Sequence, residues 1–108
     1  MTIKLYDLPK ISMNEYFARS HWTKRNKMNK DYKLLVRSQT KIKIDYPCEV
    51  TYTFYFTKNP LDCSNCSAMV KMIEDSLFAN DSINVVQSIK IISLKSNHEY
   101  VRVVVDKI

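Results

Sequence analysis

The sequence contains no glycine among its 108 residues. The phosphate loop of Walker-type nucleotide sites and the GxGxxG turn of dinucleotide-binding folds both depend on glycine, because the backbone must approach phosphate without an intervening Cβ atom. The absence of glycine excludes both architectures. We therefore expect no enzyme that depends on a nucleotide cofactor.

The length and apolar content indicate a single folded domain over residues 1–108. Hydrophobic side chains make up 45% of the sequence and aromatic side chains 11%, which is enough for a modest core and unlike a disordered basic tail. No apolar run approaches the roughly 20 residues that span a bilayer. The segment from Met1 to Leu5 also lacks the apolar stretch of a secretory signal. We expect an intracellular protein with no membrane association.

Three cysteines, Cys48, Cys63 and Cys66, are an odd number in a chain without an export signal, so we expect free thiols rather than a disulfide framework. The Cys63-x-x-Cys66 spacing is also compatible with zinc. A tetrahedral zinc site needs four ligands, however, and the remaining candidates, Cys48, His21 and His98, have no paired spacing. Small buried thiols are the favoured interpretation, and a zinc site is the alternative.

Positive charge is concentrated in the first half of the chain. The formal net charge is +6, and residues 1–58 contain 12 basic and 5 acidic side chains, whereas residues 59–108 contain 5 and 6. The asymmetry indicates that the two halves meet different partners. Positive charge of this kind favours a polyanion such as a nucleic acid.

The segment between residues 19 and 43 combines basic and aromatic side chains. Asp31 is its only acid, and His21, Trp22 and Tyr32 are interspersed among nine basic residues. The nine are Arg19, Lys24, Arg25, Lys27, Lys30, Lys33, Arg37, Lys41 and Lys43. Such a segment suits a phosphate backbone with exposed bases, and Trp22 either stacks on an unpaired base or anchors a loop. The alternative interpretation of the segment is a solvated helix face.

Side-chain alternation predicts four strands. The first covers residues 2–6, and the second covers residues 49–57, where β-branched and aromatic side chains predominate. Two further strands are expected over residues 83–94 and 99–105, joined by a hairpin turn at residues 95–98.

Two amphipathic helices are expected between these strands. The first follows a loop and runs from Lys30 to Ile44 with Asn29 as its N-cap, so that Tyr32 and Val36 point inward. The second covers residues 64–79 and carries a buried stripe, namely Ala68, Met69, Met72, Ile73, Ser76 and Leu77. The predicted order β-α-β-α-β-β is an α+β fold with a mixed sheet and two helices.

Three aspartates lie at or near the ends of predicted elements. Asp62 follows the aromatic strand, Asp75 lies one helical turn after Lys71, and Asp81 precedes the third strand. A helix of about 14 residues carries the chain roughly 20 Å, so Asp62 and Asp81 meet only if the next strand folds back. Grouped carboxylates would suit Mg²⁺ acting on a phosphodiester, with Lys71 offsetting charge on phosphorus. Ordinary surface aspartates are the alternative.

Short motifs occur at both ends of the chain. Leu8-Pro9-x-x-Ser12-x-Asn14-x-Tyr16 precedes the basic, aromatic segment. In the second half, Leu61-Asp62-Cys63-Ser64-Asn65 is followed by Met69-Val70-Lys71, by Asp75-Ser76-Leu77 and by Asn80-Asp81-Ser82. In this order the motifs resemble those of the RusA-type Holliday-junction resolvases of phages and prophages. That family's pattern is Asp-x-Asp-Asn, then Lys and Asp-x-Leu on one helix, then Asp-Asp.

The resemblance covers essentially the whole chain and implies roles for the matching residues. Asp62, Lys71 and Asp81 would be catalytic, and Asp62, Asp75 and Asp81 would bind Mg²⁺, for which Mn²⁺ could substitute. The residues assigned to DNA binding are Asn14, Arg19, His21, Trp22, Lys24, Arg25 and Lys27.

Two positions depart from the family pattern, because Ser64 and Asn80 stand where the pattern has aspartates. The spacing from Asn65 to Lys71 is also longer than usual. A serine hydroxyl is a poorer Mg²⁺ ligand than a carboxylate. These departures leave open a protein that binds junctions without cutting them efficiently.

The resemblance implies a homodimeric, Mg²⁺-dependent endonuclease that cuts branched DNA such as a four-way junction. Its expected place is DNA recombination or repair in the cytoplasm of a bacterial or phage-infected cell. The first alternative is a nucleic-acid-binding protein of the same fold with a degenerate site. The second is an unrelated basic module that binds RNA or a protein partner.

Overall fold

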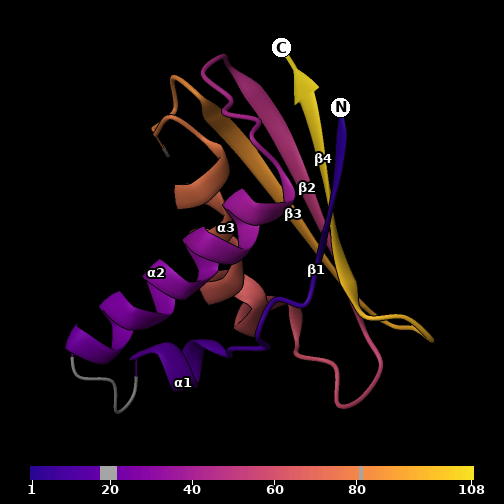
Figure 1. The fold of residues 1–108 in the computed structure, drawn as a ribbon. Coiled ribbons are helices and arrows are strands. Elements are labelled where there is room, and N and C mark those ends of the chain that lie inside the picture. The colour runs from indigo at the N-terminus through magenta and orange to yellow at the C-terminus, as the bar shows by residue number, and fades with distance from the viewer. Residues whose placement is uncertain (18–21, 81) are drawn as a thin grey trace.

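The computed structural model describes residues 1–17, 22–80 and 82–108. The elements in chain order are β1 (Thr2–Tyr6), α1 (Met13–Phe17), α2 (Trp22–Gln39), β2 (Cys48–Phe56), the 3₁₀ helix η1 (Cys63–Cys66), α3 (Ser67–Leu77), β3 (Val86–Lys95) and β4 (Tyr100–Lys107) (Figure 1). They form a small α+β domain, as predicted. None of the helices in these ranges is long and apolar enough to cross a membrane.

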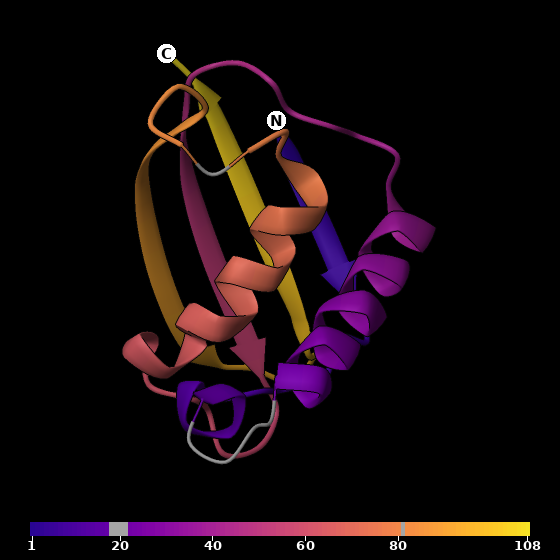
Figure 2. The same ribbon diagram turned by 90° about the vertical axis from the view of Figure 1, so that its left-hand side faces the viewer.

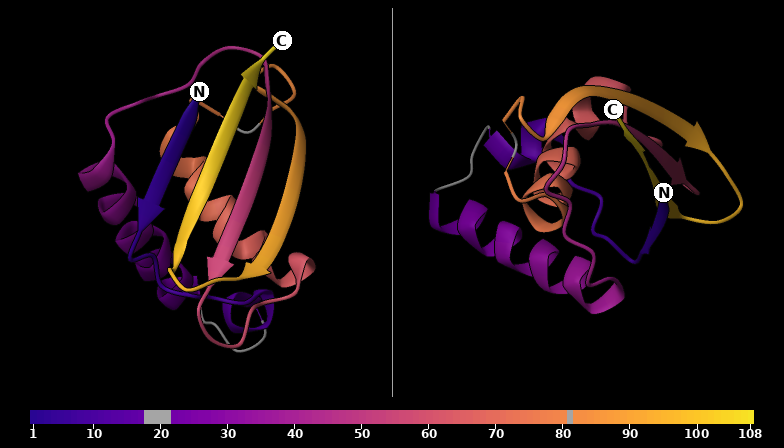
Figure 3. Two further views of the ribbon diagram at one scale, coloured as in Figure 1. Left: turned by 90° about the vertical axis from the view of Figure 1, so that its right-hand side faces the viewer. Right: turned by 90° about the horizontal axis from the view of Figure 1, so that it is seen from above.

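The strands form one mixed sheet of four strands in the order β1-β4-β2-β3. Strand β4 runs antiparallel to both β1 and β2, whereas β2 and β3 are parallel. The parallel pair requires a crossover connection, and α3 lies within it. The described helices lie on one face of the sheet and leave the other face uncovered (Figures 2 and 3).

The core lies between the sheet and the helices. On β2 the side chains that face the helices are all buried, and they are Cys48, Val50, Tyr52, Phe54 and Phe56. The rings of Tyr52, Phe54 and Phe56 stack along the strand, with centroids 6.4 and 6.0 Å apart. The predicted stripe of the second helix is confirmed, because all six of its residues are buried on α3. Tyr32 and Val36 of α2 complete this layer, also as predicted.

Two turns use a backbone conformation that glycine often provides. Asp7 follows β1 with a φ of 59°, and Asn59 follows β2 with a φ of 47°. Among residues with a Cβ atom, Asn and Asp enter this left-handed region most readily, because their short polar side chains form local hydrogen bonds. Both turns therefore close without glycine.

The structure corrects the predicted start of the first helix. The sequence predicts Asn29 as an N-cap, but α2 begins at Trp22, so Asn29 lies within the helix. The Asn29 side chain instead accepts a hydrogen bond from the Tyr16 hydroxyl at 2.9 Å. The expected loop before the helix also contains α1. The capping preference of Asn predicted a helix start at Asn29, but this side chain instead makes a contact between α1 and α2.

The same helix also ends earlier than predicted, at Gln39 rather than Ile44. The guanidinium of Arg37 donates to the carbonyl of Lys41 at 2.9 Å and to that of Ile42 at 2.6 Å. The Ile44 N–H then donates to the Leu77 carbonyl at 2.8 Å, which joins this segment to the end of α3. The chain therefore leaves the helix to make tertiary hydrogen bonds.

The expected hairpin between the last two strands is wrong. β3 and β4 are consecutive in the chain, yet β2 lies between them and pairs with both. The connection crosses the end of β2, where the Ser96 N–H donates to the Phe56 carbonyl at 2.8 Å. The polar turn residues identify a chain reversal and not the pairing partner. The aromatic strand β2 is more apolar than its neighbours and takes a central place.

Two fully buried tyrosines allow a matched test of the core. The Tyr52 hydroxyl has no hydrogen-bond partner among the described residues, whereas the Tyr32 hydroxyl donates to the carbonyl of Pro9. A net hydrogen bond contributes about 1 kcal/mol, and an unpaired buried hydroxyl costs free energy. We expect Tyr32→Phe to lower the free energy of unfolding by about 1 kcal/mol and Tyr52→Phe to leave it unchanged or raise it. Urea denaturation measures both, and equal losses would contradict the assignment.

Candidate functional site

A surface hollow of about 300 Å³ lies where α1 and the start of α2 meet α3. Its lining consists of Tyr16, Phe17, Trp22, Arg25, Asn26, Asn29 and Lys71. We call it the α1–α2–α3 hollow. The hollow brings together two residues predicted to contact DNA, Trp22 and Arg25, and the lysine predicted to be catalytic. Figure 2 shows α1, η1 and the start of α2 at the same end of the molecule.

The short helix α1 orients the aromatic side of the hollow. The Ser12 hydroxyl accepts a hydrogen bond from the Glu15 N–H at 3.0 Å, which is an N-cap arrangement. Tyr16 is buried, and its hydroxyl donates to Asn29 Oδ1 at 2.9 Å. This bond ties α1 to α2. The neighbouring Phe17 is left at the surface.

Two exposed aromatic rings lie on the rim of the hollow. Phe17 is 48% exposed and Trp22 is 60% exposed. The Arg25 guanidinium carbon lies 5.7 Å from the centroid of the Phe17 ring, and the Phe17 ring packs edge-on against Tyr16. The exposure of Trp22, at the first residue of α2, favours a stacking role over that of a half-buried loop anchor. A guanidinium beside an exposed aromatic ring can contact both bases and phosphate.

The exposed side of α2 is strongly basic. Its exposed lysines are Lys24, Lys27, Lys30 and Lys33. Asp31 is the only acid of this helix and lies 3.4 Å from Lys27 in an exposed pair, which adds little stability because water screens it. Arg37 is only partly exposed beside Lys30 and Lys33, and its guanidinium donates to backbone carbonyls, including that of Ser76 at 3.3 Å.

The predicted metal ligands are only partly placed by the structure. Asp62 is exposed just before η1, and its carboxylate does not cap that helix. Asp75 is exposed near the end of α3, so these two carboxylates flank opposite ends of the η1–α3 segment. Asp81 lies outside the described residues. Within residues 1–17, 22–80 and 82–108, no three His, Cys, Asp or Glu side chains form a group that could hold a metal ion.

Lys71 lies between two depressions of the surface. It lines the α1–α2–α3 hollow and also an open groove of about 430 Å³ beside β3. The groove is otherwise formed by Ser67, Val70, Glu74, Ile89 and Ile91. Glu74 is only 8% exposed there. The exposed ammonium of Lys71 is thus accessible from the side that carries Trp22 and Arg25.

The other residues predicted to bind DNA are divided between α1 and α2. Asn14 is exposed on α1, and Lys24 and Lys27 are exposed on α2. Arg19 and His21 lie outside the described residues, and their roles stay predictions. The structure therefore brings Trp22, Arg25 and Lys71 together in the hollow, whereas Asp62 and Asp75 are not among the residues that line it.

Phe17 and Asn29 also line this hollow, and neither was predicted to be a site residue. A signal for the aromatic side was present, because Ser12 is followed three residues later by Glu15, which is the capping-box spacing that begins a helix. A helix starting at Met13 would have placed Phe17 close to the basic segment. The contact of Asn29 with Tyr16 depends on tertiary packing and has no local signal.

No protein-family model matches this chain, and no curated protein matches it either. The resemblance to RusA-type resolvases therefore rests on the sequence motifs alone, and the chemistry of the hollow has to be considered on its own.

The three thiols differ in burial, which gives a direct chemical test. Cys48 and Cys66 are buried as expected, whereas Cys63 is exposed, contrary to the expectation that all three are buried. Burial raises the pKa of Cys48, and it raises that of Cys66 to about 11, so the reactive thiolate is scarce near neutral pH. We expect only Cys63 to react rapidly with Ellman's reagent in the folded protein, and Cys63→Ser to remove that phase. Rapid reaction of the variant would contradict this burial.

Proposed function

We propose that this protein is a Mg²⁺-dependent endonuclease that cuts branched DNA, in the manner of RusA-type junction resolvases, in the cytoplasm of a bacterial or phage-infected cell. The observation that carries the proposal is the α1–α2–α3 hollow, in which Trp22, Arg25 and Lys71 share one surface. The motifs assign the first two to DNA binding and the third to catalysis. Lys71 is far from Trp22 and Arg25 in the chain, so local sequence alone does not account for their proximity.

In this proposal, α2 supplies the contacts to DNA. Lys24 and Lys27 are exposed and would neutralise phosphates, releasing condensed counterions. The exposed indole of Trp22 would stack on an unpaired base at the crossover. Arg25 would hold a phosphate at the edge of the hollow, where Lys71 offsets the negative charge that develops as the P–O bond breaks.

The proposed cofactor is Mg²⁺, held by Asp62, Asp75 and Asp81. When bound, the ion would polarise the phosphodiester and lower the pKa of the attacking water. Carboxylate oxygens are suitable donors for it, but Asp62 and Asp75 do not form the site by themselves. The resemblance also implies a homodimer, which suits symmetric cutting of two strands of a four-way junction.

A second candidate is a protein of the same fold that binds junctions without cutting them efficiently. Ser64 and Asn80 favour it, because neither brings a negative charge to the position it occupies. The Asn80 side-chain oxygen already accepts a hydrogen bond from the Ser82 N–H at 3.0 Å. An unrelated RNA-binding or protein-binding module is the remaining alternative, and it predicts no preference for branched over linear duplex DNA.

Neutralising the basic start of α2 tests the binding surface. Replacing Lys24, Arg25 and Lys27 by Ala should weaken binding to a synthetic four-way junction and flatten the slope of log affinity against log salt by about 0.9 per lost contact. Fluorescence anisotropy over a salt series measures the slope. A variant lacking Lys41 and Lys43, which lie beyond the other end of α2, is the control. Unchanged binding and salt slope in the first variant would mean that the charge only solubilises the protein, and an equal loss in both variants would mean that the contacts are not concentrated at the start of α2.

The catalytic assignment is tested by nicking of the same junction with Mg²⁺. Asp62→Asn and Asp81→Asn should abolish nicking and leave binding equal or slightly tighter, because each change removes repulsion from phosphate. Lys71→Ala should slow nicking, and Ser64→Asp should accelerate it by adding a charged oxygen ligand. Glu49→Gln, at an exposed acid on the sheet, is the control.

The cleavage experiment also separates the two main candidates. If the wild-type protein cuts no branched substrate with any divalent metal and Ser64→Asp creates cleavage, the junction-binding candidate replaces the enzyme. Binding without preference for branched DNA would exclude both.

A further inference from the structure

The sheet face turned away from the helices (Figure 3), which we call the open face, carries aromatic and charged side chains. Side chains alternate along each strand, so the neighbours of core residues point to this face. Tyr6 of β1, Tyr100 of β4 and Tyr55 of β2 are paired in register and form one row across three strands. Aromatic side chains from strands far apart in the sequence therefore meet on the open face.

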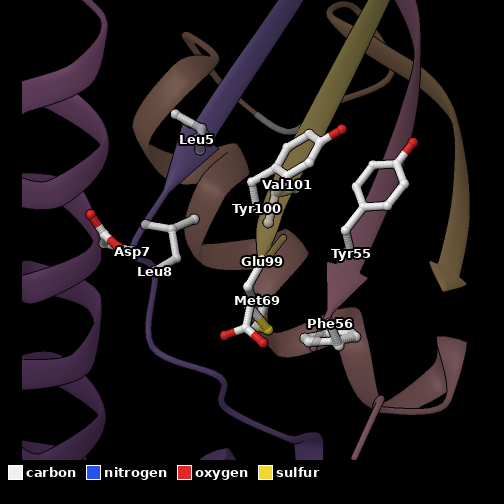
Figure 4. A pocket seen from close by; sticks show the side chains of 9 residues that line it. All are labelled: Leu5, Asp7, Leu8, Tyr55, Phe56, Met69, Glu99, Tyr100 and Val101. Atoms are coloured by element: carbon white, nitrogen blue, oxygen red, sulfur yellow. The ribbon is translucent and has the colours of Figure 1, made fainter. Parts of the chain in front are cut away.

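The three tyrosine rings of this row stack on one another. The centroids of Tyr6 and Tyr100 are 5.6 Å apart with 30° between the ring planes, and those of Tyr100 and Tyr55 are 4.5 Å apart at 21°. Figure 4 shows Tyr55 and Tyr100 on their neighbouring strands. Stacked ring pairs at these centroid distances are favourable arrangements for aromatic side chains.

The next row of the open face supplies positive charge. Lys4 and Arg102 are paired in register, two residues along their strands from Tyr6 and Tyr100. The Lys4 ammonium lies 5.8 Å from the Tyr100 ring centroid, and the Arg102 guanidinium carbon lies 5.3 Å from that of Tyr55. The Arg102 guanidinium also donates to the Tyr55 hydroxyl. The charges and the rings thus form one cluster.

The remaining side chains of the open face are a mixture of polar, apolar and charged residues. The middle of this face carries Thr51 and Thr53 on β2, with Val104 of β4 and Ile92 of β3 beside them. Leu94 of β3 is paired with Tyr55 and extends the tyrosine row toward the other edge of the sheet.

Glu49 and Asp106 face each other at the far end of β2 and β4, where they would repel a polyanion. Within the strands, the negative charge of this face is therefore confined to its far end, and the tyrosine row with Lys4 and Arg102 lies at the other end. Lys90, paired with Thr51, adds a cation on β3.

The stack is accessible at its outer end. Tyr6 is 48% exposed and belongs to β1, an edge strand of the sheet. A cavity lined in part by Tyr55, Tyr100 and Glu99 has only about 50 Å³ of space, enough for a few water molecules and too little for a base (Figure 4). A planar ligand would therefore extend the row at Tyr6 rather than enter the molecule.

We propose that the open face binds an unpaired stretch of nucleic acid, with a base stacked on Tyr6 and phosphates beside Lys4 and Arg102. Exposed aromatic side chains on four-stranded sheets stack on unpaired bases, and neighbouring cations hold the backbone. This activity goes beyond the proposed cleavage, because it uses neither the hollow nor a metal ion. Its surface lies on the opposite side of the sheet from α2 (Figure 3).

The test measures binding of fluorescein-labelled oligothymidylate without metal, in a background where Lys24, Arg25 and Lys27 are replaced by Ala. In this background the contribution of α2 is removed. Tyr6→Ala should weaken binding about fivefold or more, and Lys4→Ala should flatten the salt slope by about 0.7. Tyr6→Phe should bind like the parent, because it keeps the ring.

Matched controls come from a similar pair outside the open face. Lys107 lies 5.1 Å from the ring centroid of Tyr46, which precedes β2. Tyr46→Ala and Lys107→Ala should leave oligothymidylate binding unchanged. If thermal melting shows that Tyr6→Ala does not fold, Tyr6→Leu removes the ring and retains apolar area, and the same weakening is expected.

Three results would overturn this proposal. The first is a background variant that binds no oligothymidylate, and the second is equal binding by Tyr6→Ala and its parent. The third is loss of self-association by Tyr6→Ala in sedimentation velocity with unchanged binding, which would assign the open face to a second copy of the chain. None of them bears on junction cleavage, so failure here is distinguishable from failure of the proposed function.

Discussion

Strand β2 positions the rest of the molecule, because it is hydrogen-bonded on both sides and faces the helices with an unbroken line of buried side chains. Its Tyr52, Phe54 and Phe56 rings stack along the face of the sheet that the helices cover. Its parallel pairing with β3 forces the chain through α3, which carries Lys71. The location of the candidate site therefore follows from the placement of one aromatic strand.

Local sequence patterns predicted much of this arrangement. The alternation over β1, the aromatic composition of β2 and the apolar spacing of α3 each predict which side chains are buried. The burial patterns of these three elements confirm the predictions. The pairing of β3 and β4 was not predictable in this way, because a turn signal does not say which strand is inserted between two others. The early start of α2 depends on the contact between Tyr16 and Asn29, which is made only once α1 packs against it.

The sequence predicted the basic and aromatic part of the candidate site better than its acidic part. The basic, aromatic segment indicated Trp22 and Arg25, and the structure places both beside Lys71. The acidic residues are different, because a carboxylate at an element end is common and its grouping depends on the path of the chain. In the described residues, Asp62 and Asp75 lie at opposite ends of the η1–α3 segment. The helix predicted over residues 64–79 already implies this separation, because Asp62 precedes it and Asp75 lies near its end.

The two faces of the sheet combine cations with aromatic rings in different ways. On the helix side, the charges lie on α2 beside the exposed rings Phe17 and Trp22. On the open side, alternation along the strands places Lys4 and Arg102 directly against tyrosines. Under the two proposals, one face would contact the duplex arms of a junction and the other an unpaired segment.

Photo-crosslinking of a four-way junction tests the central claim most directly. An iododeoxyuridine at the crossover would be irradiated in the complex, and the attached peptide would be identified by mass spectrometry. We expect attachment at Phe17 or Trp22, the exposed rings of the hollow. Attachment only at sites remote from the hollow, with Phe17 and Trp22 unmodified, would contradict the assignment of the α1–α2–α3 hollow as the junction-binding surface.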